Sequence, residues 1–132
     1  MTRGEFERLV EEALNDIPPR FREAMKNLAI VIEEEPSPDL LEEMEITPPD
    51  SLYGLYQGTP LTERGWGYGN ALPDRIALYR RVIEEDSEDA EDIVVCIAET
   101  LIHEIGHYFG LSEDEIEEIE EKYWRGDSLD DV

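Results

Sequence analysis

The sequence contains one cysteine, Cys96, and two histidines, His103 and His107, among its 132 residues. A single cysteine cannot form an intrachain disulfide, and it cannot build a zinc site from several thiolates. Because Cys96 lies within an apolar stretch, we expect it to be a small buried residue. The chain must therefore rely on its hydrophobic core rather than on covalent cross-links.

Basic residues are scarce, with 11 Lys and Arg against 35 Asp and Glu, and the formal net charge is −24. A surface of this sign repels nucleic-acid phosphates and anionic lipids, so neither nucleic acid nor membrane is an expected partner. The simplest interpretation of the charge is a solubilising surface, since charged side chains are usually exposed. A preference for basic or cationic peptides is the alternative.

Long hydrophobic runs are also missing. No segment approaches the ~18 apolar residues of a membrane span, and residues 1–7 contain no apolar core of a signal peptide. We therefore expect a cytoplasmic protein. The length predicts one domain, residues 1–132, that buries roughly two-thirds of the surface of its unfolded chain.

Hydrophobic periodicity predicts a mixture of helices and strands. The expected helices span 3–16, 88–109 and 113–124, and the expected strands span 28–35, 51–57 and 73–80. The run Leu28–Ile32 is uninterrupted and rich in β-branched residues, which is typical of a strand covered on both faces. Val82 and Ile83 are expected to extend the last strand.

The helix expected at 88–109, with Ser87 as its N-cap, has one apolar arc. Placing residues at 100° intervals gathers Val94, Ile97, Ala98, Leu101, Ile105 and Tyr108 on that arc. His103 and His107 fall on the opposite side, together with Cys96, Glu99 and Thr100. We therefore expect this helix to bury one face and to direct both imidazoles away from the core.

The two histidines form the pattern H-E-x-x-H with Glu104. Residues four apart lie one turn above each other, so His103 and His107 can bind one Zn²⁺ while Glu104 activates water. The pattern alone is weak, because two solvated histidines on an acidic helix would also produce it. Here it is favoured because the chain has no other histidine and both face away from the apolar arc.

A catalytic zinc site needs a third protein ligand and an open position. Gly110 is placed to end the helix in a left-handed turn, and Ser112 with Glu115 forms a capping box for the next helix. This turn folds the chain back and brings Glu113 near His107. Two further carboxylates remain alternative ligands, namely Asp114 and Glu117.

The extended spacing His103-Glu104-x-x-His107-x-x-Gly110-x-x-Glu113 resembles the Asp-zincin motif H-E-x-x-H-x-x-G-x-x-D, with Glu113 where that motif has Asp. More closely, the chain resembles the mini-zincins, the zincin-like metallopeptidase family, over roughly residues 5–122. The similar segments outside the motif are 52–58, 60–65 and 72–76. All three methionines precede the motif, so a metzincin Met-turn is excluded.

The resemblance implies a minimal α+β zincin-like fold, with a small mixed three-stranded sheet packed on helices that include the H-E-x-x-H helix. It implies a zinc peptidase in which His103, His107 and Glu113 hold Zn²⁺ and Glu104 is the general base. Zincins bind substrate as an extra strand along a sheet edge, for which 51–57 is the candidate, with the strands in the order first, third, second.

The chain between 64 and 70 is rich in glycine and aromatic residues, and we expect it to be either a surface loop or a loop that faces substrate. The resemblance also requires a group that stabilises the oxyanion, for which Tyr68 and Arg64 are the candidates. Two other functions remain open: a zinc-binding structural or interaction module without turnover, and an acidic interaction domain without metal.

Overall fold

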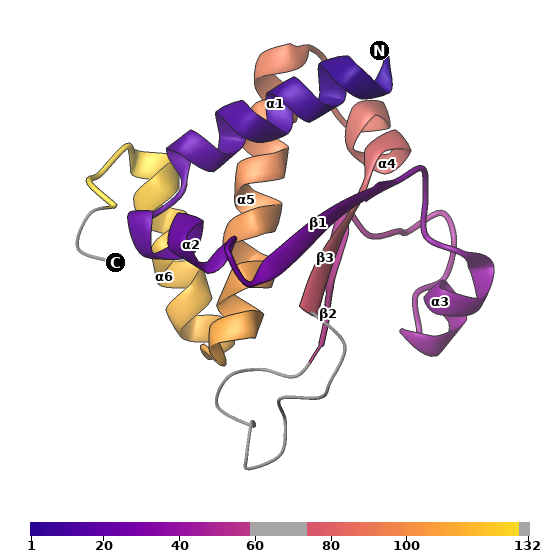
Figure 1. The fold of residues 1–132 in the computed structure, drawn as a ribbon. Coiled ribbons are helices and arrows are strands. Elements are labelled where there is room, and N and C mark those ends of the chain that lie inside the picture. Colours follow the sequence, from indigo (N-terminus) through magenta and orange to yellow (C-terminus); the bar gives the residue numbers. More distant parts are fainter. Residues whose placement is uncertain (59–73, 130–132) are drawn as a thin grey trace.

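The computed structural model describes residues 1–58 and 74–129, which form an α+β fold (Figure 1). The helices are α1 (Arg3–Asp16), α2 (Pro19–Ala24), α3 (Pro38–Glu43), α4 (Arg80–Glu85), α5 (Ala90–Phe109) and α6 (Glu113–Arg125). The strands are β1 (Leu28–Glu33), β2 (Gly54–Gln57) and β3 (Asp74–Tyr79). Within these residues, no helix has the length and apolar character needed to cross a bilayer. The predicted helices and strands are all present, with shifted ends.

The three strands form one mixed sheet in the order β1-β3-β2, as predicted. β1 pairs with β3 in parallel, from Leu28 opposite Asp74 onwards, and β2 pairs with β3 antiparallel, with Gly54 opposite Leu78. β2 therefore lies at one edge of the sheet, where the sequence predicted a strand that can accept an extended peptide.

The prediction that β1 is covered on both faces was wrong. β1 is the other edge strand, and Ala29 is exposed while the residues after it are only partly buried. The central strand β3 is the covered one, with every residue buried except Arg75. An apolar run identifies a strand, but the burial of its faces depends on neighbours that local sequence does not specify.

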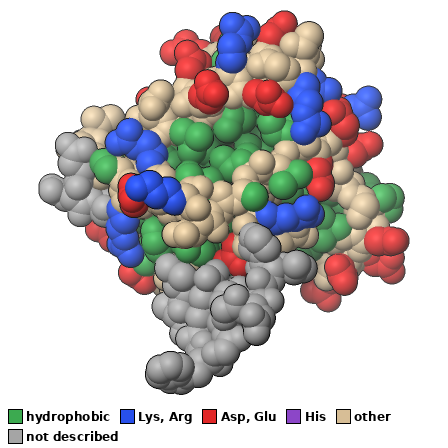
Figure 2. All heavy atoms as spheres, viewed as in Figure 1, with side chains coloured by type: hydrophobic (Ala, Val, Ile, Leu, Met, Phe, Trp, Pro, Cys, Tyr) green, Lys and Arg blue, Asp and Glu red, His purple; other side chains and the backbone are tan. Residues whose placement is uncertain are grey.

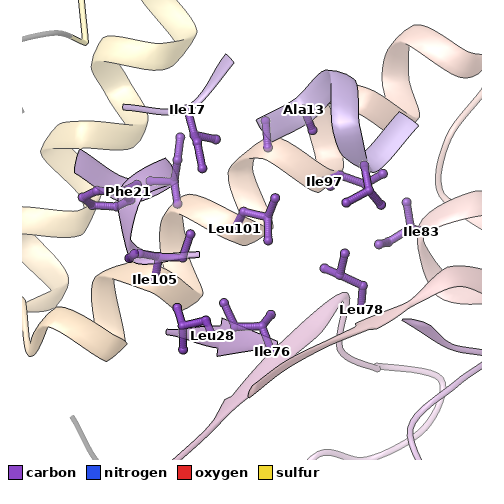
Figure 3. Packing of buried hydrophobic residues seen from close by; sticks show 14 of the residues in the cluster. Ala13, Ile17, Phe21, Leu28, Ile76, Leu78, Ile83, Ile97, Leu101 and Ile105 are labelled. Carbon is purple, nitrogen blue, oxygen red and sulfur yellow. The ribbon is translucent and has the colours of Figure 1, made fainter. Parts of the chain in front are cut away.

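The core lies between the sheet and the helices α1 and α5, which cross over one face of it (Figure 1). Its centre is made of aliphatic side chains from different elements (Figure 3): Ala13, Ile17, Leu28, Ile76, Leu78, Ile83, Ile97, Leu101 and Ile105. On the face drawn in Figure 2, hydrophobic side chains gather between α1 and β1 and charged side chains surround them.

α5 contributes more buried residues than any other described helix, so its orientation is fixed by the core.

The start of α5 differs from the prediction. The helix begins at Ala90, and its N-cap is Asp89, whose side chain accepts a hydrogen bond from the Asp92 N–H. Ser87 is not the N-cap, because its hydroxyl donates to the Ile83 carbonyl within α4. The sequence did not predict α4 itself.

Residues 80–85 are helical, so Val82 and Ile83 do not extend β3. Two ion pairs at i, i+4 spacing lie along this turn, Arg80 with Glu84 and Arg81 with Glu85, and each has an N–O distance of 4.0 Å. Such pairs favour a helix over a strand, and they were a signal that the hydrophobic pattern obscured.

Gly54 allows β2 to lie directly against α5. A Cβ atom at this position would be 2.7 Å from the Thr100 Cγ2 atom and 2.8 Å from the Ala77 carbonyl oxygen. We expect Gly54→Ala to lower the free energy of unfolding by about 1–3 kcal/mol, because the strand must move away from the helix. Urea denaturation measures the change.

Gly4→Ala is the matched control for this prediction. Gly4 lies in α1, and a Cβ atom there would have no atom within 4 Å. That substitution should be neutral or stabilising by up to ~1 kcal/mol, the difference in helix propensity. Equal effects of the two substitutions would contradict the close approach of β2 to α5.

Candidate metal centre

His103 and His107 lie one turn apart near the end of α5, on the side that the helical arc predicted. Their ring centroids are 4.8 Å apart, and each side chain is 36% exposed. One ligand atom from each of His103, Glu104 and His107 lies within 4.8 Å of the others. These three side chains therefore form a cluster that could hold a metal ion.

The turn between α5 and α6 has the predicted form. Gly110 adopts a left-handed conformation with φ 76°, and the Leu111 N–H bonds to the Gly106 carbonyl at 3.0 Å. Ser112 and Glu115 form the predicted reciprocal capping box at the start of α6. This turn places the first residue of α6 beside the histidines.

Glu113 lies between the two imidazoles. Its Oε2 atom is 3.7 Å from the His103 Nε2 atom, and its Oε1 atom is 3.5 Å from the His107 Nε2 atom. The side chain is 69% exposed, so it is reached from solvent. Asp114 and Glu117 are also exposed, and the described residues show no ion pair between either of them and a histidine.

These distances suit zinc. Zinc binds imidazole nitrogen and carboxylate oxygen at roughly 2.0–2.2 Å, so a tetrahedral site separates its ligand atoms by roughly 3.4 Å. The observed separations of 3.5 and 3.7 Å are close to that value. Two imidazoles and one carboxylate also match the ligand set of catalytic zinc sites, so His103, His107 and Glu113 could hold the ion.

Glu120 contacts the other nitrogen of His103 and was missed by the sequence reasoning. Its Oε1 atom is 3.0 Å from the His103 Nδ1 atom, and the side chain is only 28% exposed. A carboxylate at Nδ1 fixes the ring so that Nε2 faces Glu113, an arrangement common around metal-binding histidines. Glu120 follows Glu113 by seven residues, so both lie on one side of α6. That spacing could have identified Glu120 from the sequence.

Glu104 is held by the edge strand of the sheet. The residue is 9% exposed, and its Oε1 atom accepts a hydrogen bond from the Tyr56 N–H at 2.7 Å. Burial raises the pKa of the Glu104 carboxyl, while the Tyr56 N–H and the two imidazoles lower it. The sequence identified Glu104 from the motif but did not predict its burial, which comes from β2.

The outer edge of β2 borders the same region. The Tyr53 carbonyl accepts from the Tyr79 N–H, so by the alternation of antiparallel pairing the peptide groups of Gly54 and Tyr56 face away from β3. A pocket of about 310 Å³ lies between residues 51–54, at the start of β2, and the helices α5 and α6. His103 and Glu104 line it. The candidate oxyanion residues Tyr68 and Arg64 lie outside the described residues, as does the predicted loop that contains them.

Comparison with known proteins identifies a similar fold and the family of the chain. The fold is similar to that of a conserved hypothetical protein from Thermus thermophilus, with a TM-score of 0.55 and 24% sequence identity. The alignment covers 83% of this chain and 94% of that chain. No curated protein matches the sequence. The family of zincin-like metallopeptidases matches residues 25–123, which include the entire motif from His103 to Glu113, and the chain belongs to that family.

Proposed function

We propose that the protein is a zinc-dependent peptidase that hydrolyses peptide bonds. The single observation that carries the proposal is the convergence of two imidazole Nε2 atoms and the Glu113 carboxylate, with Glu104 buried beside them. Family membership implies a metal, typically zinc, and supports the same reaction class. The proposed ligands are His103, His107 and Glu113, with Glu120 as the residue that orients His103.

Glu104 is the proposed general base. Bound zinc supplies Lewis-acid chemistry, because it acidifies water and polarises a carbonyl oxygen. The hydrogen bond from the Tyr56 N–H occupies Oε1 of Glu104, which leaves Oε2 to take the proton of the attacking water. The same oxygen then returns the proton to the leaving amine.

The outer edge of β2 is the proposed substrate site. An extended peptide that pairs with the Gly54 peptide group and with the Tyr56 carbonyl would add a strand to the sheet, a common mode of peptide recognition. Because the Tyr56 N–H already bonds to Glu104, this edge also brings the substrate backbone close to the base. Main-chain pairing would hold the scissile bond in place with little dependence on side chains.

The ligand assignment predicts which substitutions remove zinc. We expect His103→Ala and Glu113→Ala each to weaken zinc binding by more than about 100-fold. Loss of a residue that only hydrogen-bonds to a metal ligand typically costs roughly 10–100-fold. Asp114→Ala and Glu117→Ala should leave the affinity unchanged, because neither pairs with a histidine in the described residues. Competition with a chromophoric chelator measures the dissociation constants, and unchanged binding in His103→Ala would refute the assignment.

The role of Glu120 predicts a smaller effect on zinc affinity. Glu120→Ala should weaken zinc binding roughly 10–100-fold, because the His103 ring loses the partner that fixes its orientation. Glu120→Gln keeps an oxygen that accepts from the Nδ1–H, so it should recover part of the affinity. Unfolding of the metal-free variants is the control for a purely structural effect, and Glu121→Ala, at an exposed position of α6, is the matched substitution.

The role of Glu104 predicts loss of cleavage without loss of zinc. Glu104→Gln retains an oxygen that accepts from the Tyr56 N–H but cannot take a proton, so kcat/KM should fall by about 10²–10⁴-fold. Zinc content and peptide cleavage are measured on the same preparations. If both proteins hold zinc and neither cleaves any peptide, the chain is instead a non-catalytic zinc-binding module, and the peptidase proposal fails.

A further inference from the structure

The pocket beside the proposed metal centre has the size of a small ligand site. Its volume of about 310 Å³ is at the lower end of the roughly 300–1,000 Å³ of ligand pockets, which suits one long side chain. Its walls are residues 51–54 on the strand side and Glu99, His103 and Glu120 on the helix side. Because Glu104 also lines it, whatever fills this pocket lies next to the proposed reacting groups.

The described lining of the pocket contains acidic side chains and no basic one. Glu99 lies one turn before His103 on α5, and Glu120 faces it from α6. Among the residues that the structure describes, none that lines the pocket is Lys or Arg, and Glu99 forms no ion pair with any of them. Within the same described residues, Glu120 bonds to His103 and forms no ion pair with Lys or Arg.

The electrostatics of Glu99 reflect this arrangement. Its carboxylate is half-buried, and burial raises its pKa, with the charge of Glu120 raising it further. Two carboxylates that face one partly enclosed pocket repel each other unless a cation lies between them. A positive group in the pocket would therefore be stabilised by both acids at once.

We propose that this pocket binds a Lys or Arg side chain of the substrate next to the scissile bond, with Glu99 as the residue that determines the preference. The inference rests on the proposed peptidase function and names its substrate class. A substrate strand on the outer edge of β2 would pass this pocket, because residues 51–54 form both the pocket wall and the approach to the strand. The amine or guanidinium would pair with the Glu99 and Glu120 carboxylates.

The experiment uses the full-length zinc-loaded protein and internally quenched peptides that differ at one position, which holds Lys, Arg, norleucine or Glu. We expect kcat/KM for the Lys and Arg peptides to exceed that for norleucine by about tenfold, and Glu to be the poorest. Glu99→Gln should bring kcat/KM for the Lys and Arg peptides close to that for the norleucine peptide. Glu99→Lys should make the Glu peptide the best substrate. A ratio that Glu99→Gln leaves unchanged would overturn the proposal.

Glu118→Gln is the matched control. Glu118 is exposed on α6 and does not line the pocket, so this variant removes the same charge without altering the pocket. An equal loss of preference in Glu118→Gln would show that the net charge of −24 attracts basic peptides, and that outcome overturns a local role for Glu99. Zinc content of Glu99→Gln must remain at the wild-type value, since a loss of metal would assign Glu99 to metal binding instead.

A binding measurement separates this inference from the proposed reaction. Zinc-loaded Glu104→Gln should bind the Lys peptide about tenfold more tightly than the norleucine peptide, as measured by fluorescence anisotropy of labelled peptides. Selective binding without turnover in the wild type would refute the peptidase proposal and retain the pocket. Equal binding of the two peptides, with turnover intact, would refute the pocket and retain the peptidase.

Discussion

The hydrogen bond from the Tyr56 N–H to the Glu104 carboxylate joins the edge of the sheet to the helix that carries both histidines. It depends on the close approach of β2 to α5 at Gly54, where a side chain would collide with Thr100 and with the backbone of β3. α5 is consequently buried against the core on one side and against β2 on another. The side that remains open holds the imidazoles, so packing of the helix decides which groups face solvent.

The candidate centre gathers negative charge around two imidazole rings. Glu104, Glu113 and Glu120 all lie against the histidines, and none of the three pairs with Lys or Arg in the described parts of the chain. Such an arrangement is costly without a cation, because like charges at short range oppose one another. A bound cation would offset that repulsion, and its binding free energy would then add to the stability of the folded state.

The features that could be predicted from the sequence were those set by residues close together in the chain. Gly110 and Ser112 located the turn and the start of α6, and the motif with that turn brought Glu113 to the histidines. The order of the strands was also correct, because it followed from the family resemblance. The family itself was identified for the same reason, since its motif is contiguous.

The features that were missed depend on residues far apart in the chain or on competition between patterns. The burial of Glu104 arises from a strand 48 residues away, which no periodicity reveals. The exposure of β1 follows from its place at the sheet edge. Val82 and Ile83 were assigned to a strand because the hydrophobic pattern was given more weight than the ion pairs of α4.

The turn at Gly110 has a consequence for the order in which the centre assembles. All the proposed ligands lie within residues 103–113, so two adjacent helices suffice to bring them together, and local contacts of this kind form early in folding. The position of Glu104 against β2 requires the complete sheet, in which β1 must pair in parallel with a strand 46 positions further along. Placement of the proposed ligands and placement of the proposed base therefore depend on different contacts, the first on the turn between α5 and α6 and the second on the sheet.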